Sequence, residues 1–286
     1  MCDDPLLSGT LALGGGTALN MLHVSPTPRL SEDLDFNFRH VEERDWGIVR
    51  DDVDRRLKGV LYGLGYTRDD VRIQAKWNLG RFHVHYRALT GTSGSLKVEI
   101  GYMRRMPILE GDIRLPFVHP IHGTEAMVKT PQREEQFASK VCTLVSRKGE
   151  HSYPRDHFDV RTISLQEFDW NLLVDLVMID SLMDGLNLES VRPRPLDLDH
   201  VAMLNRMLRG RADVAAVVAV ATDFFERVRL AAVDRGWSEF SDTFKRTGVV
   251  KIDLLKNPSR INPRISEHPE LLWVRRPRAD GEPRGR

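Results

Sequence analysis

Two stretches decide how the first half of this chain is expected to fold: Gly14-Gly15-Gly16-Thr17-Ala18-Leu19 and Ser31-Glu32-Asp33-Leu34-Asp35-Phe36. Glycines such as Gly15 and Gly16 let backbone N–H groups close on a phosphate at the start of a helix, where the helix dipole favours negative charge. We predict a strand over residues 8–13, then the glycine turn, then a helix that Thr17 caps. Thr17 is also a candidate phosphate contact.

The second stretch places two carboxylates side by side on a predicted strand over residues 33–38. Strand side chains alternate between faces, so Asp33 and Asp35 point the same way while Leu34 and Phe36 enter the core. Two such carboxylates repel each other unless a cation lies between them, and hard oxygen ligands suit Mg²⁺ that carries phosphates. A solvated strand end is the alternative. The glycine turn followed by this pair favours a metal-dependent nucleotidyl transfer.

The composition is that of a globular protein. The chain has 286 residues, of which 41% are apolar and 29% charged, and its net charge is +1. It has no apolar run near the ~20 residues of a membrane span, and its N-terminus has no leader pattern, so we expect no membrane segment. Two cysteines, Cys2 and Cys142, are too few for a disulfide framework, which favours a reducing cytoplasm.

The patterns along the chain predict a mixed first half and a helical second half. After the 33–38 strand we expect a helix over 42–64 and an antiparallel meander of strands over 71–77, 81–89 and 95–101. We also expect an edge strand over 115–118. Beyond Pro131 the predicted helices cover 133–148, 155–166, 168–185, 197–209, 212–235 and 238–246.

These patterns indicate two domains and a tail. We predict an α/β core over residues 1–125, a helical domain over 126–275 that completes an active-site cleft, and a disordered basic tail over 276–286. The arginine run 206–211 is usually a solvated helix end, although in a protein acting on RNA it could hold backbone phosphates.

Four blocks of sequence resemble the AbiEii-type nucleotidyltransferase toxins of bacterial type IV toxin–antitoxin systems, a family of the DNA polymerase β-like superfamily. The blocks are Gly15–Leu19, the Arg-x-Ser-x-Asp-Leu-Asp-Phe of residues 29–36, Lys140 on a predicted helix, and the Arg-Asp-x-x-Asp of residues 155–159. The resemblance implies an α+β fold: a polymerase-β-like nucleotidyltransferase core, with a mixed sheet flanked by helices, followed by an all-helical half. The family usually has a longer helical stretch before its first strand, so a supporting helix is expected to be lost here or to lie upstream of an incorrectly assigned start.

The resemblance also implies roles for residues of the second half. Lys140 is expected to bind the triphosphate as a point charge, whereas its local pattern alone would favour a snorkelling lysine at the surface. Asp159 lies between Phe158 and Val160, which favours an active-site role in orienting Lys140 or a metal-bound water. Arg155 is expected to pair with a carboxylate or with phosphate.

Two further residues of the first half are candidates for the same site. Ser31 would share a strand face with Asp33 if the strand began that early, and could bind a phosphate; a plain turn residue is the alternative. Glu99 lies between apolar neighbours on the predicted 95–101 strand. Superfamily members commonly have a third acidic residue on the neighbouring strand, so the resemblance implies that Glu99 is a metal ligand or a general base.

The function implied by this resemblance is that of a toxin. It would transfer a nucleoside monophosphate from a nucleoside triphosphate, with Mg²⁺ or Mn²⁺, to the 3′ end of tRNA and so block translation. A cognate antitoxin is the implied protein partner. One alternative is nucleotidyl transfer to a hydroxyl of a protein or small molecule at the same metal site. The other is a non-catalytic α/β binding module that kept the glycine turn, which the intact Asp33 and Asp35 pair argues against.

Overall fold

The computed structural model describes residues 1–42, 44–118, 123–147, 149–208 and 210–275. The chain forms two compact units. We call Met1–Ser25, Ser31–Pro107 and Asp112–Pro131 the sheet unit, and Pro26–Leu30, Ile108–Gly111 and the described part of Gln132–Arg286 the helical unit. The predicted α/β core over 1–125 and the predicted helical domain over 126–275 stay predictions. The predicted tail, 276–286, lies outside the described residues.

A five-stranded mixed sheet forms the centre of the sheet unit. Its strands, in spatial order, are β1 (Leu11–Gly14), β2 (Asp33–Phe38), β5 (Ser93–Gly101), β4 (Leu79–Arg87) and β3 (Val71–Lys76). β2 and β5 are parallel and every other pair is antiparallel. The predicted α+β class, the mixed sheet and the antiparallel meander are therefore confirmed.

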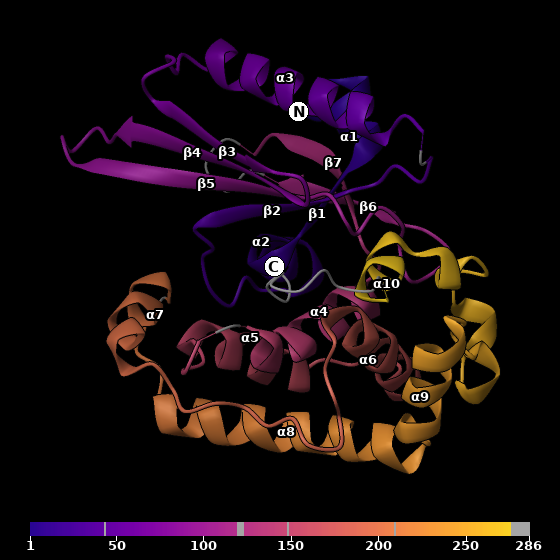
Figure 1. The fold of residues 1–286 in the computed structure, drawn as a ribbon. Helices are drawn as coiled ribbons and strands as arrows, with labels where there is room; N and C mark the ends of the chain where they lie inside the picture. The colour runs from indigo at the N-terminus through magenta and orange to yellow at the C-terminus, as the bar shows by residue number, and fades with distance from the viewer. Residues whose placement is uncertain (43, 119–122, 148, 209, 276–286) are drawn as a thin grey trace. The chain divides into compact units, whose positions relative to one another are not determined.

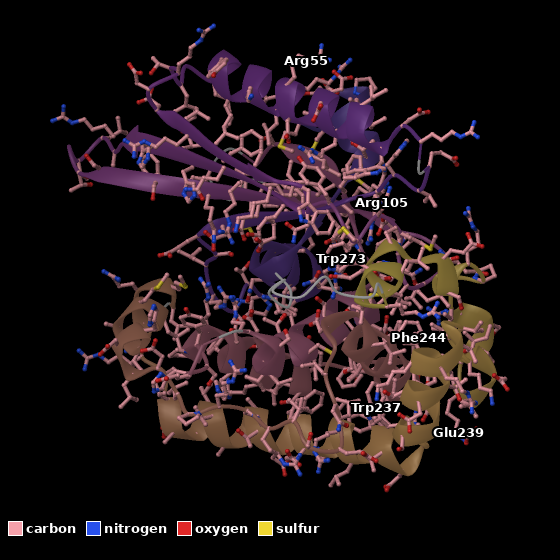
Figure 2. All side chains as sticks on the ribbon, in the orientation of Figure 1. Arg55, Arg105, Trp237, Glu239, Phe244 and Trp273 are labelled. Carbon is pink, nitrogen blue, oxygen red and sulfur yellow. The ribbon has the colours of Figure 1, made fainter. Side chains whose placement is uncertain are left out.

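One face of this sheet is apolar and packs against the helix α3 (Trp46–Gly63), which runs across it in Figure 1. Phe38, Phe82 and Val98 are almost fully buried in this core with Val53 of α3. The opposite side of α3 is polar: the Arg55 side chain is 78% exposed and points away from the sheet (Figure 2). Apolar side chains at helical spacing therefore explain the position of α3.

The N-terminus differs from the prediction. Residues Pro5–Thr10 form a short helix, α1, and the first strand begins only at Leu11, so the strand predicted from residue 8 is wrong there. The Asp4 side chain accepts hydrogen bonds from the Leu6 and Leu7 backbone N–H groups, and proline at the first helical position is already near helical φ. This Asp-Pro start signal outweighs the apolar run that suggested a strand.

The glycine turn leads into α2 (Gly15–Ala18), which continues as a π-helical turn, η1 (Leu19–His23). A separate two-stranded sheet pairs β6 (Ile113–Val118) with β7 (Glu125–Thr130). β6 confirms the predicted strand at 115–118, whereas β7 was not predicted. Its Thr130 hydroxyl donates a hydrogen bond to the Leu13 carbonyl at 2.8 Å, which ties β7 to β1.

The helical unit is built around α6 (Trp170–Asp184), whose residues from Leu172 to Met183 are buried on every side. This helix packs against α4 (Arg133–Ser146), α8 (Val214–Asp234) and α10 (Pro269–Val274). The unit also contains α5 (Pro154–Ser164), α7 (Val201–Met207) and α9 (Trp237–Thr247), together with the 3-10 turns Leu198–His200, Ile252–Leu254, Pro258–Arg260 and Ile265–Glu267. Trp237 of α9 is 1% exposed, whereas Glu239, two residues on, points outward (Figure 2). The predicted helices are confirmed except that 197–209 divides into a 3-10 turn and α7, and α10 was not predicted. Across the described ranges, none of the helices combines the length and the apolar character needed to cross a bilayer.

Candidate active site

The carboxylate pair lies on the polar face of the sheet, opposite the core. On β2, Leu34 and Phe36 pack against the apolar cluster, so Asp33 and Asp35 project from the other face. The parallel register places Asp33 opposite Lys97 and Asp35 opposite Glu99 on β5. Both aspartates are half-buried. The predicted side-by-side arrangement on a strand is therefore what the backbone produces.

Gly15 is folded against Asp35. Its φ of +64° lies in the left-handed region, and a Cβ added there would lie 2.0 Å from Asp35 Oδ2 and 2.7 Å from Asp35 Cβ. The preceding residue, Gly14, is the register partner of Asp35 on the antiparallel strand β1. Only glycine satisfies both the backbone conformation and the close approach of this carboxylate.

Gly15→Ala is therefore expected to move the Asp35 carboxylate and to lower the rate of nucleotidyl transfer on the order of a hundred-fold. A displacement of about 1 Å in a group that positions the reacting atoms is enough to cause a loss of this size. Backbone strain should add about 1–3 kcal/mol of destabilisation. Initial rates and thermal unfolding measure the two effects. The matched control is Gly59→Ala on α3, where a Cβ meets nothing within 4 Å. A Gly15→Ala protein as active as Gly59→Ala would show that Asp35 is not held by this contact.

Thr17 and Ser31 both face the start of β2. Thr17 lies inside α2 and the residue at its N-cap is Gly14, so the predicted capping role is wrong. Its hydroxyl donates instead to the Asp33 carbonyl at 2.5 Å, which fixes the carboxylate strand to the turn. β2 begins at Asp33, so Ser31 precedes the strand, and its hydroxyl lies 3.5 Å from the same carbonyl. Gly16 is held by a 2.7 Å hydrogen bond from the buried Asn20 amide to its carbonyl.

Glu99 contacts two basic side chains, Lys97 and Arg81, and also shares a side-chain hydrogen bond with Asp35. The Lys97 ammonium lies 3.6 Å from Glu99 Oε2 and 3.2 Å from Asp33 Oδ2, and Arg81 of β4 binds Glu99 Oε1. Burial by itself would raise the pKa of Glu99, but Lys97 and Arg81 hold it below its ordinary value. A carboxylate that is stabilised as an anion is a weaker base. Of the two roles predicted for Glu99, metal ligand and general base, this argues against the general base.

The donors of this site suit Mg²⁺. Magnesium is usually held by one or two carboxylates together with substrate phosphates. Asp33 and Asp35 form such a pair, and they lie beside the glycine turn at Gly15, where no side chain occupies the space next to the carboxylates. Among the described residues, no group of three or more histidine, cysteine, aspartate or glutamate side chains is arranged to hold a metal ion. Glu99 as a third ligand thus stays a prediction.

A buried ion cluster occupies the helical unit. Arg29 makes a bidentate pair with Asp159 of α5, Nε to Oδ1 and Nη2 to Oδ2, each at 2.7 Å. Lys140 of α4 adds a third contact, with its Nζ 2.9 Å from Asp159 Oδ2. The three side chains are 3%, 0% and 8% exposed in the order Arg29, Asp159, Lys140. Lys140 is therefore not a snorkelling surface residue.

Asp159 is an anion at every physiological pH. Burial alone would raise its pKa, but the charges of Lys140 and Arg29 lower it to about 2. Both of its oxygens are bound by these two cations. Asp159 is predicted to orient either Lys140 or a metal-bound water, and these contacts favour Lys140.

The remaining residues of the Arg-Asp-x-x-Asp block have separate partners. Asp156 is 2% exposed and pairs with Arg147, Nε to Oδ2 at 2.5 Å and Nη2 to Oδ1 at 3.2 Å. The Arg155 guanidinium lies over the Tyr153 ring, 5.6 Å from its centroid. Its predicted contact with phosphate stays a prediction.

Comparison with known proteins decides the family. Residues 1–247 match the model of a family described as the nucleotidyl transferase AbiEii toxin of type IV toxin–antitoxin systems. The chain belongs to the AbiEii family. The predicted resemblance is confirmed, and the chain is a nucleotidyltransferase toxin of a type IV toxin–antitoxin system. No curated protein matches the chain in sequence.

A solved structure supports the same fold. MenT4, a nucleotidyltransferase toxin from Mycobacterium tuberculosis, aligns with a TM-score of 0.55 at 20% sequence identity, over 84% of this chain and 85% of MenT4. At that identity the likeness shows that this AbiEii protein shares the fold of MenT4.

Three interacting residues of this AbiEii protein had no predicted role: Arg29, Arg81 and Lys97. Arg29 lies within the Arg-x-Ser-x-Asp block, so its position was known but not its partner. Lys97 lies two residues before Glu99 on the same strand face, and that spacing could have identified it. Arg81 could not be found without the register that places it opposite Glu99.

Proposed function

We propose that this AbiEii protein transfers a nucleoside monophosphate from a nucleoside triphosphate to the 3′ end of tRNA, with Mg²⁺, or Mn²⁺ in its place, held by Asp33 and Asp35. The observation that carries the proposal is the carboxylate pair on the polar face of β2 with Gly15 folded against Asp35. Family membership supports the nucleotide as substrate and a cognate antitoxin as partner.

In this proposal each residue has a separate task. The metal would supply positive charge at the phosphates and a lower pKa for the acceptor hydroxyl. Gly15, Gly16 and Thr17 present backbone N–H groups to phosphate oxygens, and Ser31 adds a hydroxyl. Lys140, oriented by Asp159, contributes a point charge toward the triphosphate, and Arg155 is assigned a phosphate contact. The acceptor hydroxyl gives its proton to solvent water, and its oxygen bonds to the α-phosphorus in line as the bond to the leaving pyrophosphate breaks.

The charge of the sheet supports a nucleic acid as the acceptor. On its polar face lie Arg72, Lys76, Arg81, Arg87 and Lys97, which we call the basic sheet face. Arg72, Lys76 and Arg87 are exposed, and the strands β3 and β4 that bear them contain no acidic residue. The carboxylates of the sheet are confined to β2 and β5. Cations that continue outward from the carboxylate pair suit a phosphate backbone better than a small neutral acceptor.

Replacing Arg72, Lys76 and Arg87 together by glutamine is expected to weaken tRNA binding and to flatten its salt dependence by about two units in the slope of log K against log salt, since each neutralised phosphate releases a counterion. Nucleotide affinity should not change. Filter binding or fluorescence anisotropy over a salt series measures the slope.

The comparison variant is Arg206→Gln with Arg211→Gln. Both side chains are exposed in the helical unit, whereas Arg209, the third arginine of the predicted run, lies outside the described residues. A slope that flattens in this variant and not in the sheet variant would place the RNA on the arginine run and contradict the proposed face.

Expression in cells tests the acceptor. Growth arrest should disappear together with tRNA extension in the Asp33→Ala variant, because a 3′ end that is extended cannot be aminoacylated. Arrest by the wild-type protein with every tRNA 3′ end unmodified would contradict the RNA acceptor and favour transfer to a protein or small-molecule hydroxyl.

A further inference from the structure

Lys97 lies where a cation is needed between carboxylates. Its ammonium is 3.2 Å from Asp33 Oδ2 and 3.6 Å from Glu99 Oε2. These carboxylates come from the two adjacent parallel strands, β2 and β5, and Lys97 is the register partner of Asp33. Its side chain is 30% exposed, and those of Asp33 and Glu99 are 21% and 19% exposed. The ammonium is therefore partly shielded from solvent among anions.

The geometry limits what Lys97 can do when a metal arrives. A divalent ion bound to Asp33 and the Lys97 ammonium would both be positive and would compete for the same carboxylate oxygen. Glu99 offers Lys97 a second anionic partner on its own strand, and Arg81 holds the other oxygen of Glu99 in place. Lys97 can thus leave Asp33 without losing every charge partner.

We propose that Lys97 is an internal counter-cation of the carboxylate pair: it neutralises Asp33 in the metal-free protein and must release Asp33 when metal binds, with Glu99 as the positioning residue that draws it away. This inference rests on the proposed metal site at Asp33 and Asp35. It assigns Glu99 to Lys97 and Arg81 instead of to the metal.

The test is a titration of the full chain with Mn²⁺ in the absence of nucleotide. Electron paramagnetic resonance measures the concentration of free Mn²⁺ at each step. Lys97→Met keeps the length of the side chain and removes the competing charge, so Mn²⁺ should bind roughly three- to ten-fold more tightly. The metal-free protein should unfold at a lower temperature, and saturating Mn²⁺ should raise that temperature by more than in the wild type. Lys97→Arg should resemble the wild type because it keeps the charge.

Glu99→Gln separates the two roles of Glu99. If Glu99 acts through Lys97, its loss should weaken Mn²⁺ binding only while Lys97 is present, so Glu99→Gln in the Lys97→Met background should have little further effect. An equal loss of affinity in both backgrounds would identify Glu99 as a metal ligand and overturn its assignment as a positioning residue.

Two controls keep failure of this inference distinct from failure of the proposed function. Lys76→Met removes an exposed lysine from the same sheet face on β3 and should leave Mn²⁺ affinity unchanged. Asp33→Ala should abolish the binding. If Mn²⁺ binding depends on Asp33 but is unchanged or weaker in Lys97→Met, the counter-cation role of Lys97 is wrong and the proposed metal site stands. Binding that does not depend on Asp33 overturns the proposed metal site and this inference with it.

Discussion

Asp33→Ala and Asp35→Ala are each expected to lower nucleotidyl transfer on the order of a thousand-fold or more, because each removes a ligand whose metal is worth several kcal/mol to the reaction. The fold should survive, since Asp33 is partly exposed at the sheet surface and its pair with Lys97 contributes at most about 1 kcal/mol. Asp33→Asn should behave like the alanine variant. Initial rates with labelled nucleotide and total tRNA, together with circular dichroism, measure both properties.

The control for these variants is Asp51→Ala on α3, a carboxylate whose side chain is 76% exposed. It should retain wild-type activity. Chelation by EDTA should stop the wild-type reaction, and Mg²⁺ or Mn²⁺ should restore it. Near wild-type activity of either Asp33→Ala or Asp35→Ala at saturating Mg²⁺ would show that the metal assignment is wrong.

Asp159→Asn is expected to destabilise the protein by about 3–5 kcal/mol, because it leaves two buried cations, Arg29 and Lys140, without their shared anion. Transfer by the protein that remains folded should also fall, since Lys140 loses the group that orients it. Urea unfolding at neutral pH measures the free energy of unfolding, and nucleotide dependence of the rate measures the second effect.

Asp156→Asn is the matched control on the same helix. Asp156 is also buried, but its partner Arg147 is 35% exposed and can turn toward water, so the cost should be smaller, about 1 kcal/mol. Equal losses of stability in the two variants would mean that the cluster around Asp159 is no more important to the fold than an ordinary half-exposed pair.

The pH dependence of stability follows from the same cluster. The pKa of Asp159 is about 2 in the folded protein against 3.8 for the ordinary side chain. Its contribution to stability is therefore fully present above pH 3.8 and is lost as the pH falls from there toward 2. The wild-type protein should lose about 2 kcal/mol more than Asp159→Asn over this window. Parallel loss in the two proteins would contradict the depressed pKa.

The sequence predicts those elements whose signal is local. Alternation alone places Asp33 and Asp35 on one face of β2 and Leu34 and Phe36 on the other, and the structure confirms that strand at its predicted bounds. The strands of the meander and most helices are also found near their predicted residues. The strand predicted from residue 8 fails because an apolar run does not distinguish a strand from a short helix.

The contacts of the site could not be predicted in the same way. Arg29 and Asp159 are 130 residues apart, and no local pattern indicates that a loop arginine is buried against a helix of the second half. Lys97 contacts Asp33 only because β2 and β5 are parallel and in one register, which single-sequence periodicity does not specify. The sequence therefore predicts which carboxylate and basic residues are candidates for the site, but not which of them contact one another.

Nucleotidyl transfer to tRNA is tested with purified protein, total tRNA, Mg²⁺ and each α-labelled nucleoside triphosphate in turn. We expect label from at least one nucleotide to be attached to the 3′ end of tRNA, as seen by sequencing the extended ends, and we expect Asp33→Ala to abolish this labelling. Label on protein or a small molecule with unmodified tRNA ends would contradict the acceptor, and label on tRNA with the Asp33→Ala protein would contradict the site.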